Sequence, residues 1–333
     1  MSSYDLLRIL QPTLRAVVMK TSTLSVCLIV IELLLIVVFY EAFLSYKHDL
    51  YPLCTYSSRL KIPETSVFNR PVIPSAAESL YAMYGEGNFT DDDQQLLNYI
   101  RSMTSQQGPG GRRLSNPSRV DFSQYGGALF VDKLLEQRRN GFFVECGAFG
   151  GEDLSDTLFL ERERNWSGIL IEAHPGYHRE ILRKNRRALV LRACLHPRPG
   201  LMKFKLKNWG SGVSELNKNV AAADNMTTET DVQCFSLNSI MAAIGVCHID
   251  FMVLDVEGSE IPVLESIDWR KLTVDVFSIE YNQLGPVKTM AKLNEVRDFF
   301  KRTNRRGPRY KEVGHLPLKA DESKAQDVIF MRR

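Results

Sequence analysis

The sequence has little net charge, because its 42 Lys and Arg residues exceed its 39 Asp and Glu residues by only three. Nucleic-acid-binding domains usually carry a clear basic excess, so this balance argues against a nucleic-acid partner. The six cysteines include no Cys-x-x-Cys pair and no Cys/His ligand spacing, and no His-x-His or His-Glu-x-x-His pattern occurs. These absences argue against a zinc centre, and we predict no metal site from the sequence.

A long apolar stretch lies near the start of the chain. Its core, Leu24–Tyr40, contains a single charged residue, Glu32. A bilayer is crossed by about 20 apolar residues, whereas the apolar part of a signal peptide has about 7–15. We therefore predict a transmembrane signal-anchor helix over residues 21–46, preceded by a short cytoplasmic arm over residues 1–20.

The orientation of this helix follows from what comes after it. The basic residues on its two sides nearly balance, so they do not decide the topology. Three Asn-x-Ser/Thr sequons, at Asn88, Asn165 and Asn225, all follow the helix. Sequons are glycosylated in secretory compartments, which favours a type II protein with a luminal C-terminal body in the endoplasmic reticulum, Golgi, endosomes or plasma membrane.

Two residues in this region are candidates for contacts with another chain. Glu32 lies in mid-span, where an ionisable group costs about 2.5–3.5 kcal/mol. Its apolar neighbours can carry that cost, or the carboxyl group can bind a partner helix. Cys54, just beyond the predicted helix, could form a bridge to a second chain. Oligomerisation through Glu32 or Cys54 therefore remains one of the alternatives.

The other cysteines also leave alternatives open. In an oxidising lumen, one or two disulfides could form among the five cysteines beyond Cys27, and at least one thiol would remain. The competing interpretation is that most of them are buried as small apolar residues. The five cysteines are Cys54, Cys146, Cys194, Cys234 and Cys247.

Residues 47–124 show no sustained periodicity, because prolines and the Gly-rich loop 107–113 interrupt them. We predict a stalk with one helical piece over residues 91–101. Thr90 is a plausible N-cap, and the acids that follow it suit the first turn of a helix.

Residues 125–333 alternate between short apolar runs and amphipathic segments, which predicts an α/β fold with a Rossmann-like, doubly wound sheet. A late antiparallel pair is expected at the end. Predicted strands are 142–146, 168–172, 188–194, 202–206, 232–235, 249–255, 274–280, 309–313 and 328–332. Predicted helices are 128–139, 155–164, 176–184, 236–244, 260–266 and 290–301.

Acids and glycines follow the first two of these strands, where parallel sheets form ligand crevices. The glycines at 147, 150 and 151 do not match the Gly-x-Gly-x-x-Gly spacing of a pyrophosphate site. S-Adenosylmethionine has no pyrophosphate, but it has a sulfonium, an ammonium and a ribose diol. Glu145 is placed to pair with its amino group, and Glu172 to accept its ribose hydroxyls.

A second group of acids ends two later strands. Asp255 and Glu257 lie two residues apart, and Glu280 ends the next strand. Crowded carboxylates raise at least one pKa, which supplies a candidate general base for a hydroxyl substrate. The alternative is that strand-end acids cap the following helices, and we prefer it for Glu260. His174 and His196 are interpreted as polar surface or turn residues rather than as metal ligands.

Four motifs in this order resemble the FkbM family of S-adenosylmethionine-dependent methyltransferases. They are Phe143-Val-Glu-Cys-Gly-Ala-Phe-Gly-Gly151, Ile171-Glu-Ala-His-Pro175, Leu254-Asp-Val-Glu-Gly-Ser-Glu260 and Ile279-Glu-Tyr-Asn282. The resemblance covers about residues 125–333 and implies a methyltransferase-type domain. It implies a cofactor pocket at Glu145, Gly147, Phe149, Gly151 and Glu172, and a substrate-facing catalytic cluster at Asp255, Glu257 and Glu280.

The predicted anchor, together with Leu154-Ser-Asp-Thr-Leu-Phe-Leu-Glu161, is similar to the Star-like membrane proteins of arthropods. That resemblance implies vesicle-mediated export of a membrane cargo of the epidermal-growth-factor-like type. Phe149 stands where FkbM loops usually carry Asn, so a ring replaces a polar side chain. We therefore favour an escort that keeps the methyltransferase fold, with an active O-methyltransferase on a glycan or small hydroxyl substrate as the alternative.

Overall fold

A computed structural model describes residues 90–106, 108, 110–206, 212–213, 228–283, 285–318 and 321–333. The predicted arm and membrane helix lie outside these residues, together with Glu32, Cys54, Asn88 and Asn225. From Thr90 onward, no described helix is both long enough and apolar enough to cross a bilayer.

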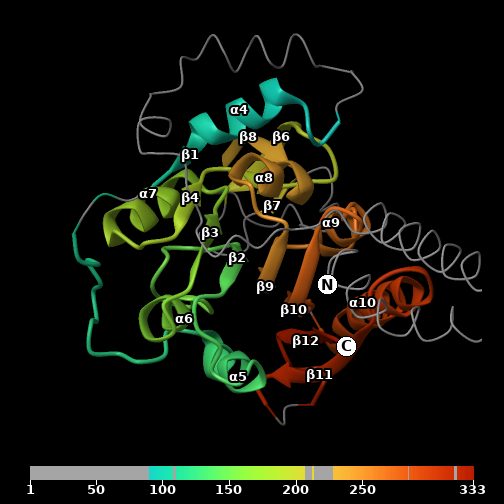
Figure 1. The fold of residues 1–333 in the computed structure, drawn as a ribbon. Coiled ribbons are helices and arrows are strands. Elements are labelled where there is room, and N and C mark those ends of the chain that lie inside the picture. The colour runs from blue at the N-terminus through green and yellow to red at the C-terminus, as the bar shows by residue number, and fades with distance from the viewer. Residues whose placement is uncertain are drawn as a thin grey trace, which may run out of the picture. The chain divides into compact units, whose positions relative to one another are not determined.

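Eight strands form the main sheet in the order β1-β4-β3-β2-β9-β10-β12-β11 (Figure 1). They are β1 (Thr104–Ser105), β2 (Phe142–Cys146), β3 (Ser167–Ile171), β4 (Leu189–Leu191), β9 (His248–Leu254), β10 (Thr273–Glu280), β11 (Tyr310–Leu316) and β12 (Asp327–Arg332). The run from β4 to β10 is parallel, and β12 is antiparallel to both β10 and β11. The predicted α/β sheet with a late antiparallel pair is confirmed.

Helices cover both faces of this sheet (Figure 1). They are α5 (Gly127–Leu134), α6 (Leu158–Glu163), α7 (Pro175–Lys184), α8 (Leu237–Ile244), α9 (Glu260–Glu265) and α10 (Pro286–Arg306). Side chains of α8, α9 and α10 share one apolar cluster with the sheet, and those of α5, α6 and α7 share the other. Helix α5 ends earlier than predicted because Glu136 and Gln137 adopt positive φ angles.

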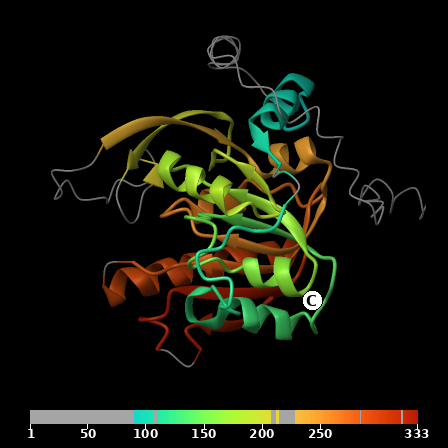
Figure 2. The same ribbon diagram turned by 90° about the vertical axis from the view of Figure 1, so that its left-hand side faces the viewer.

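A second, smaller sheet has the order β5-β8-β6-β7. Its strands are β5 (Cys194–Leu195), β6 (Gly200–Leu206), β7 (Gly212–Val213) and β8 (Thr228–Phe235). The single strand predicted over 188–194 is therefore wrong, since β4 stops at Leu191 and Cys194 already belongs to β5. Cys194 and Cys234 are register partners and form a disulfide. Figure 2 shows β8, in gold, reaching past helix α7.

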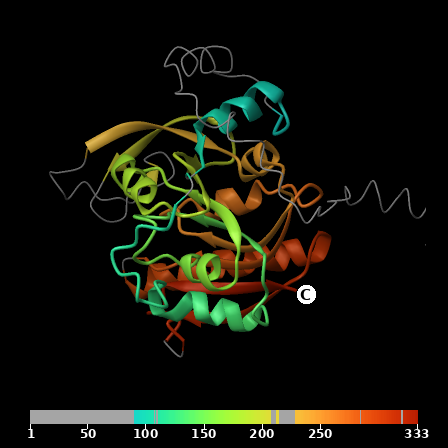
Figure 3. The same ribbon diagram turned by 60° about the vertical axis from the view of Figure 1, so that its left-hand side comes forward.

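The described part of the predicted stalk packs on the domain. Helix α4 (Gln94–Met103) buries Leu96, Leu97 and Ile100 and lies against α8, as Figure 3 also shows. Its N-cap is Asp93 rather than the predicted Thr90, because the Asp93 carboxylate accepts the amide protons of residues 95 and 96 at 2.8 and 3.2 Å. Strand β1 then pairs with β4 at the edge of the main sheet.

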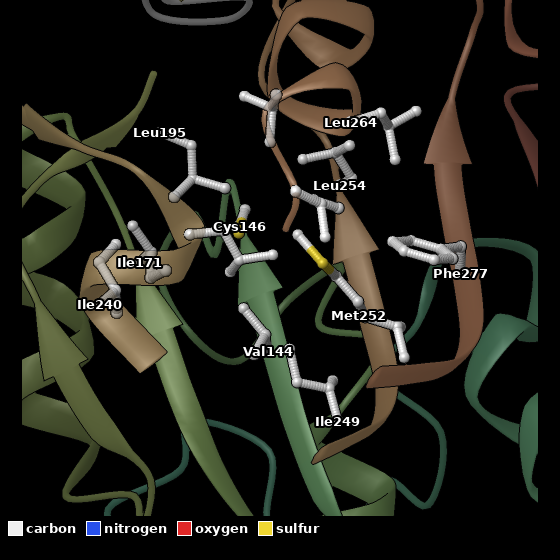
Figure 4. Packing of buried hydrophobic residues seen from close by; sticks show 14 of the residues in the cluster. Val144, Cys146, Ile171, Leu195, Ile240, Ile249, Met252, Leu254, Leu264 and Phe277 are labelled. Atoms are coloured by element: carbon white, nitrogen blue, oxygen red, sulfur yellow. The ribbon is translucent and has the colours of Figure 1, made fainter. Parts of the chain in front are cut away.

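The core follows from side-chain alternation along the buried strands. Val144 and Cys146 of β2 point to one apolar cluster, where they meet Met252 and Leu254 of β9 (Figure 4). Phe143, between them in sequence, belongs to the cluster on the opposite face. Both faces of β2 are buried, so the strand is a continuous apolar run interrupted only by Glu145.

Residues 110–119 are held against the domain by Glu152. This buried carboxylate accepts the amide protons of Ser115 and Asn116, each at 2.8 Å, and pairs with Lys184. Burial opposes ionisation, but the hydrogen bonds from Lys184 and the two amides lower the pKa of Glu152 to about 2. The segment before α5 is thereby fixed to the loop that follows β2.

Candidate active site

A crevice of about 170 Å³ opens at the carboxyl ends of β2, β3 and β9. Most of the predicted site residues line it, including Glu145, Gly147, Phe149 and Glu172. Six carboxylates belong to its lining, and the described lining contains no Lys or Arg. The six are Glu145, Asp156, Glu172, Asp255, Glu257 and Asp327. The crevice is therefore suited to positively charged ligands.

Glu145 is buried, and its carboxylate is engaged by the chain itself. It accepts hydrogen bonds from the Asp156 amide at 2.8 Å, from Ser155 Oγ at 3.0 Å and from Thr157 Oγ1 at 2.6 Å. These contacts fix residues 155–157 in a turn, so helix α6 begins at Leu158 and not at the predicted Ser155. Glu145 thus holds the wall of the crevice, a role that its place at a strand end did not predict.

Arg186 ties this turn to the rest of the fold. Its guanidinium is fully buried and donates to Gly151 O at 3.0 Å, Ser155 Oγ at 2.9 Å and Thr157 Oγ1 at 2.9 Å. It also pairs with Glu161 at 3.1 Å. Burial works against ionisation of Glu161, but the charge of Arg186 lowers the pKa of this carboxyl below its usual range. The buried guanidinium of Arg186 therefore supports both the loop at Gly151 and the start of helix α6.

Gly147 has a positive φ of 78°, and its backbone runs directly beside β9. A Cβ atom at this position would lie 2.2 Å from the backbone oxygen of Asp255. Gly151 also has a positive φ, of 75°, and a Cβ there would lie 3.1 Å from Ile181. Both glycines are needed to bring the loop close to its neighbours.

Glu172 follows β3 and meets the same loop. Its Oε2 accepts the amide proton of Phe149 at 2.9 Å, and its Oε1 accepts that of His174 at 2.7 Å. Burial raises the pKa of Glu172 to about 8, although these two hydrogen bonds lower it. The backbone of Phe149 therefore binds the carboxylate, so no polar side chain at this position is required to hold Glu172.

Three rings stand beside this carboxylate. The centroid of the Tyr177 ring is 4.1 Å from that of Phe149 and 4.3 Å from that of His174, and all three residues line the crevice. His174 is the N-cap of α7, since its Nδ1 accepts the amide protons of Gly176 and Tyr177. The turn role predicted for His174 is confirmed. Tyr177 was missed because a helical Tyr carries no sequence mark of a binding site.

The predicted acid cluster comes together at the ends of β9 and β10. Carboxylate oxygens of Asp255, Glu257 and Glu280 lie within 4.8 Å of one another. Burial raises the pKa of Asp255 to about 7, against a lowering hydrogen bond from Glu280. Burial and then the charge of Asp255 raise the pKa of Glu280 well above its usual range. The expected rise is confirmed, but burial contributes more to it than crowding does.

Glu260 has a different role from these three carboxylates. Its carboxylate accepts the amide protons of Val256 and Gly258, and it pairs with Lys292 at 3.0 Å. Glu260 belongs to the first turn of α9, but the amides that it binds lie before the helix, so it holds the loop between β9 and α9 and does not cap the helix as predicted.

Four further polar residues line the crevice that the sequence did not identify: Gln124, Asp156, Ser259 and Asp327. Asp156 lies in the turn held by Glu145. Asp327 begins β12 and is the register partner of Glu280. Asp156 was not singled out because it fell inside the predicted helix 155–164, and nothing in the sequence indicates the strand register that brings Asp327 here.

The segment of the chain that contains this site matches a known protein family. Residues 145–310 match the family model described as the Methyltransferase FkbM domain, a range that begins at Glu145 and contains every predicted site residue. No curated protein sequence matches the chain.

Several solved structures similar to this chain are described as methyltransferases, and their identity to it is low. One is a methyltransferase FkbM from Methylobacillus flagellatus KT, with 13% identity, a TM-score of 0.38 and coverage of 77% of this chain. The match spans 58% of that protein's length. Another is a precorrin-6y C5,15-methyltransferase from Geobacter metallireducens GS-15, with 10% identity, a TM-score of 0.34 and coverage of 61% of this chain and 86% of the other. From the family match, residues 145–310 of this chain are an FkbM methyltransferase domain.

Proposed function

We propose that the FkbM domain binds S-adenosylmethionine in this crevice and transfers its methyl group to a hydroxyl group of a glycan or small molecule. The observation that carries the proposal is the lining, which has six carboxyl groups and no described Lys or Arg, so a bound cation would favour the ionised form of those groups whose pKa burial raises. S-Adenosylmethionine carries a sulfonium and an ammonium group. A crevice of this charge attracts such a ligand and disfavours anionic cofactors.

Glu172 has acceptor capacity for the ribose of the cofactor, whereas Glu145 fits the amino group of the cofactor only in part. Each Glu172 oxygen accepts one backbone amide proton, and a carboxylate oxygen offers about two acceptor sites, so capacity remains for a ribose diol. Glu145 already accepts from three donors and lies 3.5 Å from Arg186. We therefore assign Glu172 to the ribose, and Glu145 to holding the loop and contributing negative charge.

The residues of the second acid cluster would face the acceptor. When bound, the cofactor supplies an electrophilic methyl group on a positively charged sulfur. Asp255 and Glu257 line the same crevice as Glu172, and Glu280 lies next to them. Their carboxylates can accept a hydrogen bond from an acceptor hydroxyl and so orient its oxygen. The rings of Phe149 and Tyr177 cover apolar surface beside Glu172 and exclude water from that side.

Glu172→Gln tests this assignment. The amide replaces one oxygen acceptor by a donor, and leaving a buried hydrogen-bonding group without its partner costs about 1–3 kcal/mol. We expect binding of S-adenosylmethionine to the full-length chain to weaken about tenfold or more, measured by titration calorimetry. Glu295→Gln, on the exposed surface of α10, is the matched control and should bind as the wild type does. Absence of binding by the wild type at millimolar cofactor would contradict the proposal.

We propose a second candidate, a Star-like membrane escort that acts in export of an epidermal-growth-factor-like cargo. Two observations favour it. Glu145 is occupied by structural hydrogen bonds, and the Cys194–Cys234 disulfide is typical of an oxidising compartment. The predicted signal-anchor at residues 21–46 would then fix a type II protein in the endoplasmic reticulum, Golgi, endosomal or plasma membrane.

Deletion of residues 21–46 tests the escort. Surface delivery of an epidermal-growth-factor-like precursor should fall several-fold in cells that carry the deletion, measured by surface labelling of the cargo. Replacement of residues 21–46 by an unrelated apolar span of equal length is the control and should restore delivery if anchoring is sufficient. Under the escort hypothesis, Glu172→Gln leaves delivery intact. Unchanged delivery after the deletion would exclude this function.

A further inference from the structure

The sequon Asn165-Trp-Ser167 occupies a surface turn between helix α6 and strand β3. Asn165 is exposed, whereas the Trp166 side chain is fully buried and donates from Nε1 to the backbone oxygen of Arg138 at 2.7 Å. The bulky residue of the sequon therefore points into the domain and does not cover the asparagine. An exposed turn is the setting in which an N-glycosylation acceptor is expected.

The backbone holds Asn165 in this turn. Its φ angle is 59°, in the left-handed region that asparagine adopts more readily than most residues. The Asn140 amide donates to Arg164 O at 3.0 Å, and the Ser167 amide donates to Gly141 O at 3.0 Å. These bonds join the turn to the segment before β2, so the sequon is fixed at the amino ends of β2 and β3.

The hydrogen bonds of the Asn165 side chain are compatible with an attached glycan. Its Nδ2 donates to Asn140 Oδ1 at 2.7 Å, and its Oδ1 accepts from Arg187 Nη1 at 2.7 Å, both at the surface. An amide nitrogen carries two protons, and this contact uses one of them. A glycan replaces one N–H and leaves the other to donate to Asn140, while Oδ1 takes no part in the new bond. The turn can therefore carry a glycan and keep both contacts.

A separate observation indicates the compartment in which this modification occurs. Cys194 and Cys234 form a disulfide that joins β5 to β8. Disulfides persist in the secretory pathway and are rare in the cytosol. Asparagine-linked glycans belong to proteins of that same pathway.

We propose that Asn165 carries an N-linked glycan. In the transfer, Asn165 Nδ2 bonds to C1 of the first sugar of a lipid-linked oligosaccharide diphosphate. The bond from that carbon to the phosphate oxygen breaks, the lipid diphosphate leaves, and one proton of Nδ2 is released. The proposal requires a luminal domain, but it rests neither on methyl transfer nor on cargo export.

The glycan would lie at the edge of the main sheet opposite the crevice. Strand β3 has five residues between the turn and its carboxyl end. A strand rises about 3.3 Å per residue, so this separates the two edges by about 16 Å. A glycan on Asn165 would therefore cover the amino ends of the strands and leave the crevice open.

The test uses the full-length chain, produced in insect or mammalian cells with Asn88→Gln and Asn225→Gln, so that Asn165 is in the one remaining sequon. We expect peptide N-glycosidase F to increase the mobility of this chain in denaturing electrophoresis. Mass spectrometry after this treatment should find aspartate at position 165 and unchanged Asn140. Asn140 is the matched internal control, because it is also exposed and left-handed but belongs to no sequon.

Two substitutions at Ser167 separate loss of the sequon from loss of the fold. Ser167→Ala removes the hydroxyl that the sequon requires and should abolish the mobility shift, as should Asn165→Gln. Ser167→Thr keeps the sequon, suits the first position of a strand, and should keep the shift. Absence of a shift in the chain with the single sequon would overturn the proposal. A shift that persists in Ser167→Ala would overturn it too.

Discussion

Gly147→Ala is expected to lower the free energy of unfolding by about 3 kcal/mol, the sum of a strained backbone and an overpacked contact. The new Cβ would lie 2.2 Å from the backbone oxygen of Asp255, and backbone atoms of a central strand cannot move away cheaply. The same displacement would shift the Asp255 carboxylate, so ligand binding in the crevice should be lost as well. Denaturant unfolding followed by circular dichroism measures the change.

Gly245→Ala is the matched control for this substitution. Gly245 has a similar positive φ of 71° at the end of α8, but a Cβ atom there meets nothing within 4 Å. It therefore isolates the cost of the left-handed conformation, about 1 kcal/mol. Equal losses in the two variants would show that the contact with Asp255 contributes nothing.

Arg186→Met is expected to destabilise the fold by about 3–5 kcal/mol, the usual cost of removing one partner of a buried ion pair. The side chain is fully buried, and its loss leaves Glu161 with the partly exposed Arg112 as its remaining cation, so the lower end of this range is expected. Ser155 and Thr157 would lose a donor at the same time, which loosens the turn that surrounds Glu145. Chemical denaturation of the full-length chain gives the magnitude.

Arg187→Met is the matched control, because this neighbouring arginine is exposed and its hydrogen bonds go to Asn165 and to the Trp166 backbone. Surface substitutions of this kind usually change stability by about 0.5 kcal/mol or less. Arg186→Lys should fall between the two, since lysine keeps the charge but not the fork of donors. A loss for Arg186→Met as small as that for Arg187→Met would contradict the structural role of the buried guanidinium.

The sequence predicts the central strands well because they are buried on both faces. The predicted strand 142–146 coincides with β2, and the strand predicted at 168–172 lies one residue from β3. Both are short, mostly apolar runs, and Gly141 and Gly147 bound the first of them, which leaves little choice of boundary. The acid cluster could also be predicted, because the carboxyl ends of parallel strands meet at one edge.

The parts that could not be predicted depend on register and on side-chain partners. Asp327 reaches the crevice only because β12 pairs with β10 in a particular antiparallel register, and a single sequence carries no mark of that register. The strand predicted at 188–194 is divided between two sheets, although its apolar run is nearly continuous. The role of Glu145 depends on donors 10–12 residues further along the chain.

Helix α4 and strand β1 have a practical consequence for any shortened form of the protein. Strand β1 covers the outer edge of β4, and Asp91 anchors α4 by accepting hydrogen bonds from Ser236, Asn238 and Ser239 at the start of α8. A fragment that began at residue 125 would lose this cover and expose apolar surface on α8. Uncovered sheet edges pair with other chains, so such a fragment would aggregate, and a well-behaved one has to begin before Asp91.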